Sequence, residues 1–227
     1  GGYAEYIKLP IENFIIIPEE IDYKNNLLET AVVCDAVATP LKIIKKARIS
    51  SFDKVGVIGA GGGLGIHMLK MLKLNNISAI GIDTKTEKFN TCNENGAEFS
   101  VSPMENNLKN KIADYSKSHD LDVVIDFVSS KSSLELGCSI LGKGGRLVTL
   151  GGSGEQFLAN SAEMLVKELE LIGSRYCTKQ ELKESLDLYA RGLIEPLVSV
   201  KTDFDGAEGL HDKIEKGEIT GRAGILI

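Results

Sequence analysis

The sequence predicts an α/β protein built around a doubly wound, six-stranded parallel sheet. Short apolar segments typical of strands alternate with amphipathic segments of about 10–15 residues, typical of the helices that connect parallel strands. A chain of 227 residues is long enough for one large domain or for one and a half ordinary domains. Six such strands match the order 3-2-1-4-5-6. They are expected at residues 55–59, 77–83, 99–102, 121–128, 146–150 and 169–172.

The segment 54–83 carries the strongest local signal. An apolar strand ends at Gly59, a glycine-rich turn follows, and the next helix leads to a second strand that ends at Asp83, 18 residues beyond Gly65. Glycine tolerates the backbone angles of such a turn and leaves room for a phosphate to approach the main chain. The first amides of the helix and its dipole attract anions. The pattern is typical of a dinucleotide-binding βαβ unit, so the sheet is expected to be a Rossmann fold.

The glycines do not match the strict G-x-G-x-x-G pattern, because Ala60, Gly62 and Gly65 occupy its three glycine positions. A tight turn without a ligand is therefore an alternative, although the order of strand, turn, helix, strand and acid favours a cofactor. A carboxylate at Asp83 would accept hydrogen bonds from an adenosine ribose and repel a 2′-phosphate, which favours NAD over NADP. The helix is expected to bury Leu64, Met68, Met71 and Leu72. Contacts with the cofactor are expected from Gly59, Gly62, Gly63, Leu64, Gly65 and Asp83.

The composition predicts a soluble globular protein. Hydrophobic residues make up 43% of the chain, charged residues 26%, and the net charge is −6. No basic patch indicates nucleic acid, and no apolar run approaches the ~20 residues of a membrane span. The four cysteines are dispersed without a C-x-x-C pair, which argues against a disulfide framework and fits a cytoplasmic protein. Cys34 is expected to be a small buried residue.

Several other local expectations follow from pattern and capping residues. Residues 3–9 and 15–17 are expected to be short strands, and 27–46 a helix that Pro40 kinks or breaks. Capping boxes are expected at 84–87 and 178–181. The tail is expected to hold strands near 197–200 and 223–227 and a helix near 205–215. His67 is expected at an exposed helix position, and His119 and His211 in polar surroundings.

With these motifs in place, the chain resembles the medium-chain, zinc-dependent alcohol dehydrogenases. The resemblance extends from Gly2-Tyr-Ala-Glu-Tyr to Gly221-Arg-Ala-Gly-Ile-Leu. It implies a remnant of a GroES-like catalytic domain at 1–34, an NAD-binding Rossmann domain at 35–175, and a return to the catalytic domain at 176–227. The chain looks like such a protein without its N-terminal part, which normally carries the other protein ligands of the catalytic zinc.

The resemblance also implies roles for single residues. Asp35 matches a ligand of the catalytic zinc, with a helix-capping acid as the alternative, and Thr39 matches a catalytic-site residue that packs on the nicotinamide. Lys88 matches a lysine near the adenosine ribose, or is a solvated helix charge. Arg222 matches an arginine that reaches the pyrophosphate, or forms a surface salt bridge. Val128 and Gly151 would line the nicotinamide side with their backbone.

The implied function is hydride transfer between an alcohol and NAD, with zinc as a Lewis acid on the substrate oxygen. The substrate would be a small alcohol, aldehyde or ketone, and these residues alone would bind NAD without turnover. A homodimer or homotetramer would form through the sheet edge at 168–174. One alternative is a zinc-independent NADPH quinone or enoyl reductase, which Lys85 and Lys88 favour and which Asp35 and Asp83 oppose. Another is a non-catalytic nucleotide-binding module, and a methyltransferase is a weaker variant.

Overall fold

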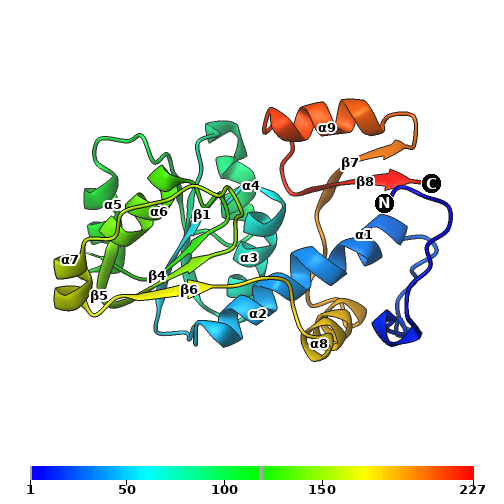
Figure 1. Cartoon of the computed structure of the whole chain (residues 1–227), viewed down its shortest axis with the longest axis horizontal. Coiled ribbons are helices and arrows are strands. Elements are labelled where there is room, and N and C mark those ends of the chain that lie inside the picture. The colour runs from blue at the N-terminus through cyan, green and yellow to red at the C-terminus, as the bar shows by residue number, and fades with distance from the viewer. Residues whose placement is uncertain (1, 118–119) are drawn as a thin grey trace.

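The computed structural model describes residues 2–117 and 120–227, so His119 lies outside the described residues. Figure 1 shows an α/β unit with a twisted sheet at its centre and, beside it, a smaller part formed by the two ends of the chain. Near the start of the chain, Tyr3 Oη lies 2.9 Å from Nε2 of His211, which belongs to the C-terminal part.

The main sheet confirms the predicted fold class. Its six strands are all parallel and follow the order β3-β2-β1-β4-β5-β6. The order reverses between β1 and β4, and ligands bind at such switch points in open α/β sheets. The strands are β1 (Lys54–Ile58), β2 (Ser78–Ile82), β3 (Ser100–Val101), β4 (Leu121–Asp126), β5 (Leu141–Thr149) and β6 (Glu170–Gly173).

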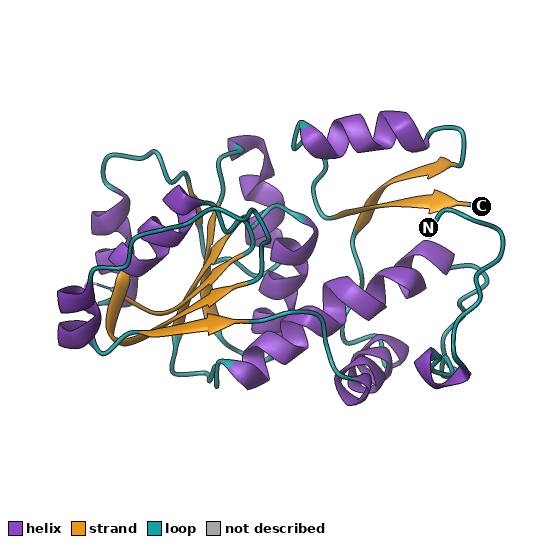
Figure 2. Cartoon of the chain, viewed as in Figure 1, coloured by secondary structure: helices purple, strands orange, loops and turns teal. Residues whose placement is uncertain are grey.

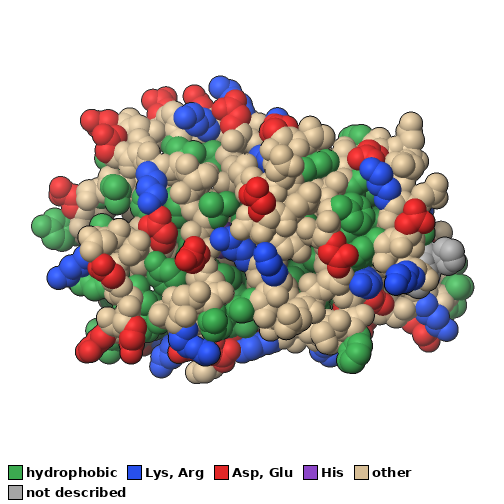
Figure 3. All heavy atoms as spheres, turned by 180° about the vertical axis from the view of Figure 1, so that it is seen from behind, with side chains coloured by type: hydrophobic (Ala, Val, Ile, Leu, Met, Phe, Trp, Pro, Cys, Tyr) green, Lys and Arg blue, Asp and Glu red, His purple; other side chains and the backbone are tan. Residues whose placement is uncertain are grey.

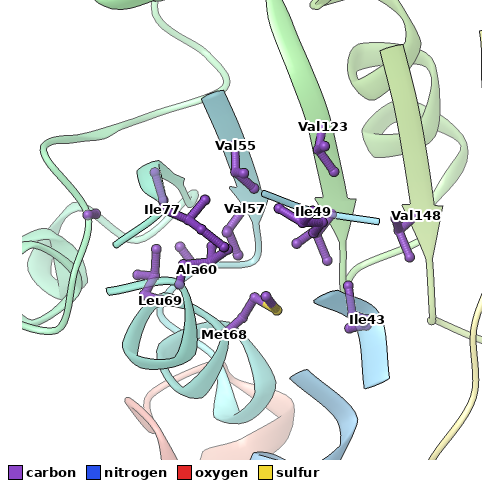
Figure 4. Close-up of a cluster of buried hydrophobic side chains, with 14 of the residues drawn as sticks. Ile43, Ile49, Val55, Val57, Ala60, Met68, Leu69, Ile77, Val123 and Val148 are labelled. Atoms are coloured by element: carbon purple, nitrogen blue, oxygen red, sulfur yellow. The ribbon is translucent and has the colours of Figure 1, made fainter. Parts of the chain in front are cut away.

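Helices cover both faces of this sheet. Figure 4 shows one layer of the core, in which Ile43 of α2 and Met68 of α3 lie against Val57 and Val148 of the strands. A second cluster on the other face takes Ile112 from α5 and further residues from α6. The helices of this unit are α2 (Ala38–Lys46), α3 (Gly63–Leu74), α4 (Phe89–Glu94), α5 (Leu108–Ser116), α6 (Lys131–Ser139) and α7 (Ser161–Lys167).

The helix caps are only partly as predicted. Asn160 caps α7, and a capping box between Thr178 and Glu181 starts α8 (Lys179–Ala190). The capping box predicted at 84–87 is wrong. Instead, the Lys85 amide donates to the Asp83 carboxylate at 3.0 Å, and α4 begins at Phe89 after a short 3₁₀ turn.

The N-terminal segment differs from the expectation. Residues 3–9 and 15–17 form no strand, and a single 3₁₀ turn spans Ile11–Asn13. Their apolar and polar residues alternate, but among the described residues no neighbouring strand pairs with them, and an extended segment needs a partner for its backbone groups. The predicted strands are therefore wrong.

A long helix leads from this segment into the main sheet. It consists of α1 (Leu27–Val32), a π-helical turn at Val33–Val37, and α2. The irregularity directly precedes Pro40, which lacks the N–H that would bond to the preceding turn of the helix. In place of the predicted kink or break, the helix widens into the π-helical turn. Asp35 lies inside this turn.

The C-terminal part returns beside the first residues of the chain. Its strands β7 (Val198–Asp203) and β8 (Arg222–Leu226) pair in parallel, and α9 (Ala207–Glu215) connects them. Figure 2 shows this two-stranded sheet standing apart from the main one. A third core cluster joins α8 to the long helix and to α3; its buried members are Ile21, Val33, Val37, Met71, Leu186 and Ile194.

The surface carries both signs of charge. On the face drawn in Figure 3, acidic and basic side chains are interspersed with small apolar areas. Within the described residues, no helix combines the length and the apolar character needed to cross a bilayer.

Candidate functional site

The glycine turn between β1 and α3 is held by its own backbone. The Gly59 amide donates to the Ile82 carbonyl at 2.9 Å, and the Gly62 amide donates to the Gly59 carbonyl at 3.1 Å. Gly59 has a φ of 77°, which favours glycine. A Cβ on Gly65 would lie 2.2 Å from the Gly59 oxygen. The helix therefore starts directly on the turn, and its first amides face the carboxyl edge of the sheet.

Two cations pack against this turn. A Cβ on Gly61 would lie 2.5 Å from Lys88 Cδ, and one on Gly63 would lie 2.7 Å from Arg222 Cδ. Lys88 is 6% exposed, and its Nζ donates to the Ile219 carbonyl at 2.7 Å. The alternative of a solvated helix charge at Lys88 is therefore wrong.

Asp83 lies at the end of β2, on the other side of the turn. It is 9% exposed, and its Oδ2 accepts the Gly61 amide at 2.8 Å. Its Oδ1 accepts the Lys85 amide. Each carboxylate oxygen has a second lone pair, so Asp83 can still accept hydrogen bonds from the hydroxyl groups of a ligand.

Asp35, Thr39 and Arg222 form a second polar cluster beside the turn. An Arg222 Nη2 donates to Asp35 Oδ2, and the Thr39 hydroxyl donates to Asp35 Oδ1 at 3.2 Å. The Arg222 Nε is buried and has no hydrogen-bond partner among the residues that the structure describes. Asp35 lies within the long helix, so the capping alternative for it is wrong, and its pair with Arg222 is only partly exposed.

Three adjoining cavities run along the carboxyl edge of the sheet. The first, of about 320 Å³, is largely apolar, and the second, of about 400 Å³, lies over the glycine turn. Gly59, Asp83 and Val128 line both of them. The third, of about 700 Å³, shares Leu64 with the second and reaches the ends of β5 and β6. Leu64 is thus a half-buried wall of this groove and not a core residue as predicted.

The predicted site residues are distributed along the groove. Gly59, Gly62, Gly63, Leu64, Gly65, Asp83, Lys88, Val128 and Arg222 line the second cavity. Asp35, Thr39 and Gly151 line the third, together with the basic residues Lys42, Lys46 and Arg175, which the sequence did not single out.

Asp126, at the end of β4, organises the groove wall and was not predicted. This buried carboxylate accepts the amides of Val128 and Ser129, each at 2.9 Å, and the Ser133 hydroxyl at 2.7 Å. The Ser129 hydroxyl in turn accepts the Gly151 amide at 2.7 Å. The available signal was an acid that ends a buried strand just before a serine-rich turn.

His67 is another residue that the sequence misplaced. It is completely buried in α3, and burial lowers its pKa from 6.5 to about 4. Its ring lies 2.6 Å from the Gly63 carbonyl and accepts the Leu197 amide at 2.9 Å. His67 therefore connects the first turn of α3 to the segment that enters β7.

The described residues do not by themselves fit a zinc ion. Among them, no three histidine, cysteine, aspartate or glutamate side chains lie close enough together to hold a metal. Both oxygens of Asp35 already contact protein groups. Cys34, next to Asp35, is exposed and not buried as expected, and its Sγ donates to the Ala31 carbonyl. One possible ligand is present, whereas catalytic zinc requires about three protein ligands.

The groove does fit a dinucleotide. An apolar cavity suits a flat base, a fixed carboxylate suits a sugar, and a glycine turn at a helix N-terminus suits a diphosphate. The buried Arg222 Nε beside Gly63 has no partner in the described ranges 2–117 and 120–227, and a phosphate oxygen would be one.

The known proteins that this chain resembles include dehydrogenases and reductases. A family model described as "Zinc-binding dehydrogenase" matches residues 63–191, more than half of the chain. An NAD-dependent alcohol dehydrogenase of Sulfolobus acidocaldarius is 27% identical over 98% of this chain and 63% of its own length. The crystal structure of the alcohol dehydrogenase from Aeropyrum pernix has a TM-score of 0.91 at 27% identity, covering 100% of this chain and 65% of that one. An acetophenone reductase from Geotrichum candidum, in complex with NAD, has a TM-score of 0.80 at 27% identity, covering 95% and 59%. The chain thus spans about 63% of the length of the curated relatives.

Proposed function

The chain belongs to the zinc-binding dehydrogenase family, and on this premise we propose that it is the coenzyme-binding part of an NAD-dependent alcohol dehydrogenase. The observation that carries the proposal is the groove in which Asp83, the glycine turn and Arg222 follow one another. The activity of the whole protein is hydride transfer between an alcohol and the nicotinamide. Its substrate is a small alcohol, aldehyde or ketone.

Each part of the groove has a role in this proposal. The amides at the start of α3 and the Arg222 guanidinium bind the diphosphate, and Asp83 accepts from the adenosine ribose. The apolar cavity beside Val128 receives the adenine. Thr39 and Gly151 lie on the nicotinamide side. When bound, NAD supplies the hydride chemistry, and these residues bind and orient it.

Asp35 as a zinc ligand stays a prediction. Since the donors for zinc are not assembled among the described residues, we derive no step that passes through the metal. We propose accordingly that these 227 residues bind NADH but do not oxidise alcohols at the rate of an intact enzyme.

The groove favours NADH over NADPH. A 2′-phosphate would approach the Asp83 carboxylate and be repelled by it. Of the two lysines that could neutralise such a phosphate, Lys88 is buried and its Nζ donates to the Ile219 carbonyl, so Lys85 is the more accessible one. This argues against the alternative of an NADPH-dependent quinone or enoyl reductase.

Titration with NADH and NADPH tests the proposal. The chain has no tryptophan, so the fluorescence of the reduced cofactor itself is used to report binding. We expect NADH to bind at least about tenfold more tightly than NADPH, a difference of about 1.4 kcal/mol. The variant Asp83→Ser should reduce this ratio, whereas Asp212→Asn on the exposed face of α9 should leave it unchanged. Tighter binding of NADPH would favour the reductase, and binding of neither would remove the proposed site.

A further inference from the structure

We infer that Asp35 is a positioning residue for the cofactor, because it holds the Arg222 guanidinium in place to receive the diphosphate. This inference rests on the proposed function and adds to it a role for Asp35 that needs no metal. The two residues are 187 positions apart, one in the π-helical turn and the other at the start of β8.

The carboxylate of Asp35 is itself held at both oxygens. Thr39, one turn later in the helix, donates its hydroxyl to Oδ1, and Arg222 donates Nη2 to Oδ2. A π-helical turn holds more residues than an α-helical turn and so redirects the side chains it carries. Asp35 lies in the middle of this turn and is aimed at the final strand. The long helix thereby presents a fixed anion to Arg222.

The guanidinium is held at one edge and free at another. Asp35 occupies Nη2, while Nε is buried and has no partner within the described residues. Arg222 Cδ and Nε both lie 2.7 Å from the position of a Cβ on Gly63, the first residue of α3. The unused N–H therefore lies beside the helix amides that face the second cavity.

A buried N–H without a partner costs about 1–3 kcal/mol. A phosphate oxygen at the N-terminus of α3 would remove this cost, because guanidinium forms strong, directional bonds with phosphate. The planar guanidinium of Arg222 has donors along more than one edge, so one edge can contact Asp35 while another contacts the ligand. Without Asp35, the long side chain of Arg222 regains its rotamers, and binding must order it again.

A role for Asp35 in holding Arg222 requires no metal ion, whereas a role as a metal ligand does. A metal at Asp35 would compete with Arg222 for Oδ2, and the described residues offer no cluster of donors to assist it. If Asp35 serves Arg222, its contribution to cofactor affinity persists when every metal ion has been removed.

Calorimetric titration in EDTA tests this role. Three variants of the full chain are compared: Asp35→Asn, Arg222→Gln and the double variant. We expect Arg222→Gln to weaken NADH and ADP-ribose about 10–100-fold, as the loss of a hydrogen bond to a charged group does. Asp35→Asn should weaken both about 3–10-fold. It should have little further effect in the Arg222→Gln background, because the two residues act as one unit.

Adenosine, which lacks the diphosphate, separates positioning from general damage. Its affinity should be the same in all variants. As a matched control, Asp187→Asn removes an exposed ion pair with Arg191 and should leave every affinity unchanged.

An Asp35→Asn variant that binds NADH as tightly as the wild type, or more tightly, would overturn the inference. An equal loss for adenosine, or a full additional loss in the double variant, would do the same. If the wild-type chain fails to bind NADH at all, the proposed function itself fails, which is a distinct result.

Discussion

The Leu197 amide donates a 2.9 Å hydrogen bond to Nε2 of His67, across 130 positions of the chain. Because Nε2 accepts this bond, the ring proton of a neutral imidazole lies on Nδ1 and is donated to the Gly63 carbonyl at 2.6 Å. One buried side chain thus joins the glycine turn of the main sheet to the segment entering β7. The hydrogen bonds define a histidine that is neutral in the folded protein.

This arrangement predicts that His67 makes stability depend on pH. Burial lowers the pKa of His67 from 6.5 to about 4. Between these values the unfolded chain binds a proton that the folded chain does not, so stability falls as pH drops from 6.5 towards 4. From pH 6.5 to 5, the contribution of His67 should decrease by about 2 kcal/mol. Urea unfolding at both pH values gives the free energy of unfolding of each protein. Between pH 6.5 and 5 this free energy should decrease less for His67→Gln than for the wild type.

Carboxylates also titrate as the pH falls, so the comparison is between variants. His211 is exposed and hydrogen-bonded to Tyr3, and His211→Gln serves as the control, with a pH dependence like that of the wild type. If His67→Gln loses as much stability as the wild type between pH 6.5 and 5, the neutral, buried state of His67 is refuted.

The glycine turn should not accept a methyl group at Gly65. An alanine Cβ there would lie 2.2 Å from the Gly59 oxygen and 2.6 Å from the Ala60 oxygen. Gly65→Ala should therefore lower the free energy of unfolding by at least about 2 kcal/mol. Gly209 in α9 has no described residue beyond its own stretch of helix within 4 Å of its Cβ position, so Gly209→Ala should raise stability by up to about 1 kcal/mol. Equal effects of the two changes, measured by denaturant titration, would contradict the close packing.

Among the acids of the groove wall, substitution of Asp126 should cost the most stability. Asp126→Ala removes the acceptor of two amides and one hydroxyl in a completely buried position, which should cost about 2–4 kcal/mol. Asp126→Asn keeps one oxygen for the amides and should cost about 1 kcal/mol. Thermal unfolding of both variants shows which of them loses more stability. A loss as large for Asn as for Ala would mean that the charge, and not the hydrogen bonds, holds the turn.

The free edge of the sheet at β6 is the proposed interface between subunits. Leu171 is 42% exposed on this strand, and α7 beside it exposes Leu165 and Val166. An uncovered apolar edge invites pairing with a second chain. Sedimentation should give a dimer or tetramer for the wild type and a smaller species for Leu171→Lys. Ile214→Lys, on exposed α9, should not change the mass. A wild-type monomer would count against this interface.

The fold of the main sheet was predictable because its signals are local. The alternation of strands and helices depends on neighbours within a few residues, and so does the cap at Thr178. The strands predicted at 3–9 and 15–17 fail for the opposite reason, since alternation indicates a strand only where another strand can pair with it.

For the candidate site, the sequence predicted several of its residues, but it did not predict which residues they contact. The turn and Asp83 are predictable, because a short segment carries the whole pattern. The pairing of Asp35 with Arg222 and the burial of His67 were not, because both depend on the return of the chain after α8. For Lys88, the sequence left open both a position near the ribose and a solvated helix charge, and the distant Ile219 carbonyl excludes the second.

A crystal structure of this chain with NAD⁺ would show where the cofactor binds. We expect the diphosphate over the amides of Gly62–Gly65, within reach of Arg222, and an adenosine ribose hydroxyl on the Asp83 carboxylate. A complex in which the cofactor lies elsewhere, or in which side chains of the protein occupy the glycine turn, would contradict this expectation.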